Sequence, residues 1–177
     1  IPPSQINDFA LPQNDDMISL DPAEMYEIST YELVGNVYVT LVSIDPHDTS
    51  HILPRVAESW SASDDGLTYT FKLRAGQKFH SGNALTAADV VYSFQRLAAL
   101  DLAPAFLITD LGISKENMND TLKAVDDLTF QFKVDKPYAP SYVINVLSAS
   151  NFAIVDSKLL KSHETNGDWG NGWLKTN

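Results

Sequence analysis

The stretch that most constrains the fold runs from residue 54 to residue 96 and combines a hairpin pattern with a helix start. Between Leu67 and Leu73, apolar or aromatic side chains alternate with threonine and lysine, which is the period of a strand buried on one face. The Asp64-Asp65-Gly66 sequence before it is typical of a tight turn. We therefore expect the residues that lead into this turn, Ser59 to Ser63, to pair with the alternating strand.

A helix is expected after the hairpin and a short loop. Thr86 is a candidate N-cap, and Asp89 three residues later completes a capping box in which aspartate replaces the usual glutamate. Apolar side chains then recur on one helical stripe, at Val90, Val91, Phe94 and Leu97. The stretch predicts strand, turn, strand, loop and a helix that ends near Leu100.

The rest of the chain gives weaker patterns. We expect helices at Ala23–Thr40, from Pro140 to Leu147 and at Asp156–Glu164, with a helical turn within Ile113–Asn119. Strands are expected at Leu41–Ile44, Thr121–Asp127, Leu128–Val134 and Phe152–Val155, and a glycine-rich loop at 166–173. Residues 1–16 show no period and are expected to be extended or poorly ordered.

Composition limits the possible functions. The chain of 177 residues is long enough for about one domain with a core and carries a net charge of −11, which opposes nucleic-acid binding. It contains no cysteine, so disulfides, cysteine metal sites and a cysteine nucleophile are excluded. No apolar run is as long as a membrane-spanning helix, so we expect a chain that does not span a membrane.

Most candidate catalytic groups have a structural explanation. His80 lies in a loop, His47 and His51 flank a turn that contains Pro46, and the Asp64-Asp65 and Asp126-Asp127 pairs fit turn chemistry. No nucleophile elbow, phosphate-binding loop or dinucleotide fingerprint occurs. We therefore expect no catalytic site, no metal site and no cofactor.

Three motifs carry a resemblance to a known family. They are P-x-x-A-E-S-W from Pro54, D-D-G-L-T-Y-T-F-x-L-R-x-G-x-K-F-H-x-G from Asp64, and T-A-x-D-V-V-Y-S-F-x-R from Thr86. In this order and spacing they resemble the oligopeptide/dipeptide-binding family of extracytoplasmic solute-binding proteins, solute-binding protein family 5, which serve ATP-driven importers.

The resemblance implies a mixed α/β fold. It implies a periplasmic-binding-protein-like first lobe with an inserted β-hairpin and helix subdomain, truncated before the second lobe. Residues 1–45 then start lobe I, 46–147 form the inserted subdomain, and 148–177 return into lobe I incompletely. The family opens with a strand where this chain has only the weak pattern of Phe9–Gln13.

The resemblance also implies a function. The intact protein is then the substrate-binding component of an ATP-driven importer in the periplasm or elsewhere outside the cytoplasm of a bacterium. It binds peptides or a similar small solute and delivers them to a membrane permease, without catalysis. Because the groups that fix a peptide's ends lie mainly in the second lobe of the family, we expect weak or no peptide affinity for this chain alone.

The ligand-binding residues are carried over by position. The family's cleft is bordered by the segment at Asn14 to Met17, which includes Asp16 and Met17, and by the residues after Asp21-Pro22, which are Tyr26, Glu27 and Ile28. A carboxylate can pair with a ligand ammonium group, and a tyrosine offers an apolar face with a polar tip. The alternative for Tyr26 and Glu27 is an exposed helix start with no ligand.

Two other functions remain open on the sequence. A non-transport interaction or sensor module could use the same lobe alone, in which case the reading frame would lack a second α/β lobe. A hydrolase would need an acid/base pair, and none can be placed.

Overall fold

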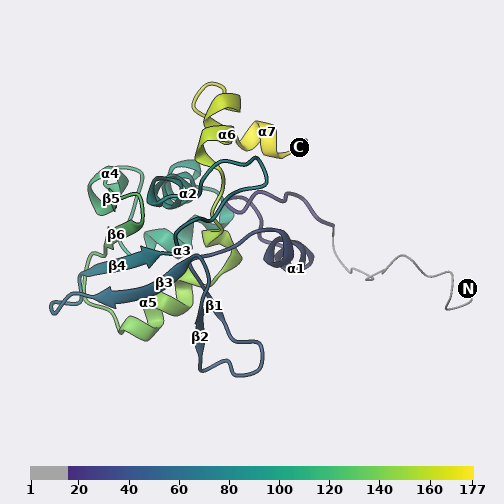
Figure 1. Cartoon of the computed structure of the whole chain (residues 1–177). Coiled ribbons are helices and arrows are strands. Elements are labelled where there is room, and N and C mark those ends of the chain that lie inside the picture. Colours follow the sequence, from purple (N-terminus) through teal and green to yellow (C-terminus); the bar gives the residue numbers. More distant parts are fainter. Residues whose placement is uncertain (1–15) are drawn as a thin grey trace, which may run out of the picture.

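The computed structural model describes residues 16–177, and its largest element is a four-stranded antiparallel sheet (Figure 1). The strands are β3 (Ala57–Ala62), β4 (Thr68–Leu73), β5 (Leu122–Asp126) and β6 (Thr129–Lys133), in the spatial order β3-β4-β6-β5. The sheet therefore consists of two hairpins joined by the β4–β6 pair, in which Phe71 lies opposite Phe130. A separate pair, β1 (Val42–Ile44) and β2 (Ile52–Pro54), forms a hairpin that extends away from this sheet.

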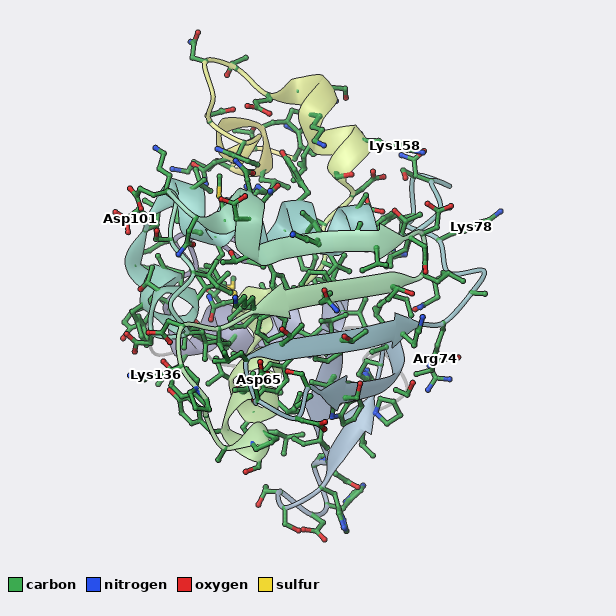
Figure 2. All side chains as sticks on the ribbon, turned by 90° about the vertical axis from the view of Figure 1, so that its left-hand side faces the viewer. Asp65, Arg74, Lys78, Asp101, Lys136 and Lys158 are labelled. Carbon is green, nitrogen blue, oxygen red and sulfur yellow. The ribbon has the colours of Figure 1, made fainter. Side chains whose placement is uncertain are left out.

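One face of the sheet supplies most of the core. Tyr69, Phe71 and Leu73 of β4 and Phe130 and Phe132 of β6 are buried. Several of the aromatic rings stack along the sheet, for example those of Tyr69 and Phe132, whose centroids lie 5.2 Å apart. Figure 2 looks onto the other face, with Arg74 and Lys78 at one side of the sheet and Asp101 and Lys136 at the opposite side. The period of two therefore separates a core face from a solvent face, as expected.

Helices cover the core face. The longest helix, α2 (Ala87–Leu100), packs against β5 and β6, and its Phe94 contacts Phe130 and Phe152 edge-on at centroid distances of 5.1 and 5.0 Å. Apolar residues of α5 (Pro140–Leu147) join the same core. The remaining elements are α1 (Ile28–Val37), η2 (Ala103–Ala105), α3 (Phe106–Thr109), α4 (Met118–Thr121), η3 (Ser150–Phe152), α6 (Ser157–His163) and α7 (Asn171–Leu174).

Both hairpins, α2, α5 and α6 confirm the sequence predictions. The capping box of Thr86 and Asp89 is present, and Asp65 accepts hydrogen bonds from the Ser63 hydroxyl and the Leu67 amide in the first turn. Asp126 does the same for Leu128 and Thr129 in the second turn. Both aspartate pairs therefore contribute to turns, as their sequence context indicated.

The prediction of a helix over Ala23–Thr40 was wrong at both ends. The Nδ2 group of Asn151 donates to the carbonyl oxygens of Pro22 and Met25, which a helix would have used for its own amides, so α1 begins only at Ile28. At the other end Tyr38 is extended, and the Val39 carbonyl accepts a hydrogen bond from Ile154. Tertiary hydrogen bonds thus shorten the helix to Ile28–Val37.

Of three smaller predictions, one is confirmed and two were wrong. The helical turn expected within Ile113–Asn119 is present, since the Met118 amide donates to the Ser114 carbonyl at 2.9 Å, and α4 continues from it. The segment Phe152–Val155 joins no sheet, because the Val155 amide donates to the Ser93 hydroxyl instead of to a strand. The loop expected at 166–173 is shorter than predicted, because α7 begins at Asn171.

Two expectations remain untested by the described residues. The weak strand pattern at Phe9–Gln13 and the order of residues 1–15 lie outside the described residues. The division into segments 1–45, 46–147 and 148–177 remains a prediction. None of the helices between residues 16 and 177 is long and apolar enough to cross a membrane.

Candidate functional site

The candidate site is built on a turn, Asp21 to Met25, that precedes α1. The Asp21 carboxylate accepts a hydrogen bond from the Ala23 amide at 3.0 Å, and the Asp21 carbonyl accepts the amides of Glu24 and Met25, both at 2.9 Å. Asx turns of this kind favour aspartate followed by proline, and Pro22 occupies that position. The turn is buried, whereas the residues that follow it emerge at the surface.

Asn151 holds the other side of this turn. Its Nδ2 group donates to Pro22 and Met25 at 2.9 and 3.1 Å, and its Oδ1 atom accepts a hydrogen bond from the Tyr31 hydroxyl of α1. Asn151 is buried, so these hydrogen bonds are protected from water. The turn and the first part of α1 therefore share one fixed anchor.

Tyr26, Glu27 and Ile28, which the family resemblance selected, leave this turn toward solvent. The tyrosine is 56% exposed and the isoleucine 78% exposed. Among the described residues, the Glu27 carboxylate accepts two long hydrogen bonds, from its neighbour's amide at 3.3 Å and from the Thr30 hydroxyl at 3.4 Å. A half-buried carboxylate beside two exposed apolar side chains can bind an ammonium group next to an apolar one.

Phe106 is a site residue that the sequence analysis missed. Its ring meets Tyr26 edge-on, with the centroids 6.3 Å apart and the planes at 84°. Phe106 begins α3 and is 45% exposed, so the two rings form an aromatic pair at the surface rather than in the core. The only signal was an aromatic residue after Ala103-Pro104-Ala105 in a stretch without a clear period, and such a signal does not identify its partner.

Asp16 and Met17 lie on the described segment before the turn, and both are exposed. Met17 to Leu20 line one side of a shallow hollow whose other side is the chain end from Leu174 to Asn177. No direct contact links Asp16 or Met17 to Tyr26, Glu27 or Ile28 among the interactions of the described residues. The structure thus brings Tyr26 together with Phe106, whereas the role of Asp16 and Met17 stays a prediction; Asn14 lies outside the described residues.

A second hollow lies elsewhere on the molecule. It has a volume of about 410 Å³ and is enclosed by the end of α1, the loop around Phe79 and His80, α6 and α7. Its lining includes Val37, Ile154 and Trp173 and is mostly apolar. None of the five predicted ligand-binding residues lines it, so it is separate from the candidate site.

The remaining histidine and tryptophan candidates from the sequence lie outside the candidate site. His80 is exposed, and His51 pairs with Asp48 at 3.0 Å in the turn between β1 and β2. In the part of the chain that the structure describes, no group of three histidine, aspartate or glutamate side chains could hold a metal ion. Trp169 and Trp173 are half-buried and stack on Tyr92 and His163.

Comparison with known proteins places this arrangement in a family. The family model of bacterial extracellular solute-binding proteins, family 5 (middle region), matches residues 51–177. The chain is 32% identical over 132 residues to di/tripeptide-binding protein 2 of Pseudomonas aeruginosa, covering 68% of this chain and 25% of that protein. It is 44% identical over 86 residues to heme-binding protein A of Haemophilus influenzae, covering 45% of this chain and 16% of that protein.

A solved structure shows the same fold. The murein tripeptide-binding protein MppA of Escherichia coli superimposes with a TM-score of 0.72 at 28% identity, over 85% of this chain and 31% of that chain. The chain therefore spans 25% of the length of the Pseudomonas relative and 31% of the solved one. From the family match over residues 51–177 and this fold, we conclude that the chain belongs to the family 5 bacterial extracellular solute-binding proteins.

Proposed function

We propose that this chain contributes one wall of a ligand cleft to the substrate-binding component of an ATP-driven importer. The observation that carries the proposal is the exposed contact between Tyr26 and Phe106, next to the Glu27 carboxylate, on a turn fixed by buried hydrogen bonds. Family membership supports it, since relatives are named as di/tripeptide-binding and murein tripeptide-binding proteins. We propose peptides or similar small solutes as the ligand class.

The proposed binding uses no covalent chemistry. Tyr26 and Phe106 offer an apolar surface on which a ligand side chain can pack, and the aromatic edges and faces favour such contacts. The Glu27 carboxylate attracts the ammonium group of a peptide or of a basic side chain. The net charge of −11 favours cationic over anionic ligands in the same sense.

The proposal extends to the partner and the location. A binding component of this family passes its solute to a membrane permease, and we place the protein outside the cytoplasm of a bacterium for the same reason. The hydrophobic and polar contacts described above orient a ligand but contain no placed acid/base pair, which supports a binding role over catalysis.

The experiment is calorimetric titration of the full-length protein with di- and tripeptides. We expect Phe106→Ala and Tyr26→Ala each to weaken binding by about tenfold, equivalent to ~1.4 kcal/mol. Glu27→Gln should weaken peptides that carry a free amino terminus more than acetylated ones. Tyr142→Ala is the matched control, because Tyr142 is 46% exposed and also contacts another ring, that of Tyr138.

Two results of the titration would contradict the proposed cleft wall. Unchanged affinity in both aromatic variants, or equal losses in the Tyr142→Ala control, would exclude this surface as a cleft wall. The same titration on the 177-residue chain tests the expectation that it binds peptides weakly or not at all. Submicromolar binding by this chain alone would show that expectation to be wrong.

A further inference from the structure

The Arg96 side chain of α2 and the Asp21 side chain form a buried ion pair. The guanidinium Nη1 and Nη2 atoms lie 2.8 and 2.6 Å from the two carboxylate oxygens. Only 1% of the arginine side chain and none of the aspartate side chain are exposed. Burial alone would raise the pKa of Asp21, but hydrogen bonds and the charge of Arg96 outweigh it, and the net pKa is lowered.

The pair connects segments that are distant along the chain. Arg96 also donates through Nε to the Trp169 carbonyl at 2.7 Å, and Asp21 accepts a third side-chain hydrogen bond from Asn171 at 2.9 Å. The Asn171 amide reaches Glu24 in the same turn at 3.0 Å. The start of the described chain, α2 and the C-terminal segment therefore meet at one carboxylate and one guanidinium group.

The ion pair also joins the two segments of the chain that carry Tyr26 and Phe106. The Asp21 oxygen that accepts from Arg96 Nη1 also accepts the Ala23 amide, so the arginine and the turn share one atom. Tyr26 follows this turn directly. On the arginine side, α2 leads through η2 into α3, where Phe106 begins the helix. The two rings of the surface pair are thus carried by the two segments that the ion pair joins.

Three directional hydrogen bonds explain why arginine is needed. A guanidinium group is planar and presents its donors in a fixed fork, whereas a lysine ammonium group is a single point charge. A lysine at position 96 could contact Asp21 or the Trp169 carbonyl but could not reproduce the bidentate geometry together with the third bond. An apolar pair of similar size could fill the space without fixing the direction of the turn.

We propose that Asp21 and Arg96 are positioning residues for the ligand-facing surface: their ion pair sets the turn from which Tyr26 meets Phe106. The function of that surface rests on the proposed function above. The positioning itself does not, because it can be measured on the rings without any ligand.

The first experiment follows Tyr26 by fluorine NMR in full-length protein labelled with fluorotyrosine, with the resonance assigned by Tyr26→Phe. In Arg96→Lys and Asp21→Asn we expect the Tyr26 resonance to shift or broaden, while that of Tyr69 in the sheet core stays in place. Arg74→Lys is the matched control, since Arg74 is exposed and, within residues 16–177, its side chain donates a single hydrogen bond, to the Arg55 carbonyl at 3.0 Å. An unchanged Tyr26 resonance in a folded Arg96→Lys protein would overturn the proposal.

A double variant separates positioning from stability. Replacing both charges in Asp21→Leu/Arg96→Met removes the buried ions, and we expect it to be more stable than the single variants Asp21→Leu and Arg96→Met. The Tyr26 resonance should nevertheless remain displaced, because an apolar contact does not fix the Ala23 amide. A resonance that returns to its wild-type position in the double variant would show that the pair only fills space.

The affinity of the same variants then links this inference to binding. We expect peptide affinity to fall in Arg96→Lys by about the factor seen in Tyr26→Ala, with Arg74→Lys unchanged. Should Tyr26→Ala and Phe106→Ala both leave affinity unchanged, the proposed function fails, yet the fluorine resonances still decide whether the ion pair positions Tyr26. Suppose that Tyr26→Ala weakens binding, and that Arg96→Lys displaces the Tyr26 resonance but leaves peptide affinity unaltered. This result would refute a role of the ion pair in ligand binding.

Discussion

Asp89 caps its own helix and at the same time holds Ser157, the first residue of α6. One carboxylate oxygen accepts the Thr86 amide and hydroxyl at 2.8 and 2.9 Å, and the other accepts the Ser157 amide and hydroxyl at 3.1 and 2.6 Å. The Asp89 side chain is buried, and its two hydrogen bonds with Ser157 are buried as well, whereas the two with Thr86 are partly buried. A local helix-start signal is therefore also a long-range contact.

We expect Asp89→Ala to destabilise the protein by about 3 kcal/mol, because two buried donors of Ser157 and two partly buried donors of Thr86 lose their acceptor. Asp89→Glu should cost less, since glutamate can still cap Thr86 but its longer side chain cannot hold Ser157 in the same place. Urea unfolding followed by circular dichroism measures both. Ala88→Ser, at an exposed position of the same helical turn, serves as the control. Wild-type stability in the glutamate variant would contradict a separate contribution from Ser157, and equal losses in the two variants would contradict capping of Thr86 by glutamate.

Asp156 should make stability depend on pH. Burial raises the pKa of this carboxyl, but hydrogen bonds from Ser81, Asn83 and the first amides of α6 outweigh it, so the folded pKa lies below the ordinary value of 3.8. A depressed folded pKa stabilises the protein above the unfolded value, and this stabilisation is lost as the pH falls through the folded value. The contribution of Asp156 is therefore complete at pH 7 and declines below about pH 4.

The corresponding experiment compares Asp156→Ala with the wild type at about pH 7 and about pH 3 by urea unfolding. We expect a loss of about 1–2 kcal/mol at the higher pH and a smaller loss at the lower one. Asp64→Asn, at an exposed turn position, should change stability little at either pH. A loss of the same size at both pH values would show that ionisation of Asp156 does not contribute to stability in this range.

Gly112 is required by its surroundings as well as by its backbone angle. Its φ is +81°, and a Cβ atom would lie 2.3 Å from the Cβ atom of Asp135. We expect Gly112→Ala to cost about 2–4 kcal/mol in thermal or urea unfolding. Gly76→Ala is the control, because φ is +78° there but no atom lies within 4 Å of the added methyl group, so only about 1 kcal/mol is expected. Similar costs at both positions would contradict the role of Asp135.

Replacement by alanine should reduce stability much more at Phe94 than at Phe106. Phe94 is 1% exposed and packs against Phe130 and Phe152, so Phe94→Ala should destabilise the protein by about 3–5 kcal/mol. Phe106 is 45% exposed, so Phe106→Ala should cost less than about 1 kcal/mol. Urea unfolding of the two variants checks this difference. A large loss at Phe106 would indicate a core residue and weaken its assignment to a ligand-facing surface.

Local patterns account for the parts of the fold that the sequence predicted correctly. The alternation in β4 and β6, the aspartates of both turns and the capping box of α2 depend on residues within a few positions of one another. The mixed α/β class and the family followed from this stretch as well. Of the site, Tyr26 and Ile28 are exposed, which fits both a cleft wall and the alternative of an exposed helix start, so their ligand-binding role remains a proposal.

The amino-acid sequence by itself determined where hairpins and the long helix form, because turn chemistry and side-chain period act between near neighbours. The tertiary structure decided where α1 begins, which ring Tyr26 meets and which carboxylate Arg96 binds. Asn151 takes the carbonyl oxygens that would have extended α1, and it lies 129 and 126 positions from the residues it binds. Partners at such separations are chosen by packing of the whole chain, and no local spacing in the sequence indicates them.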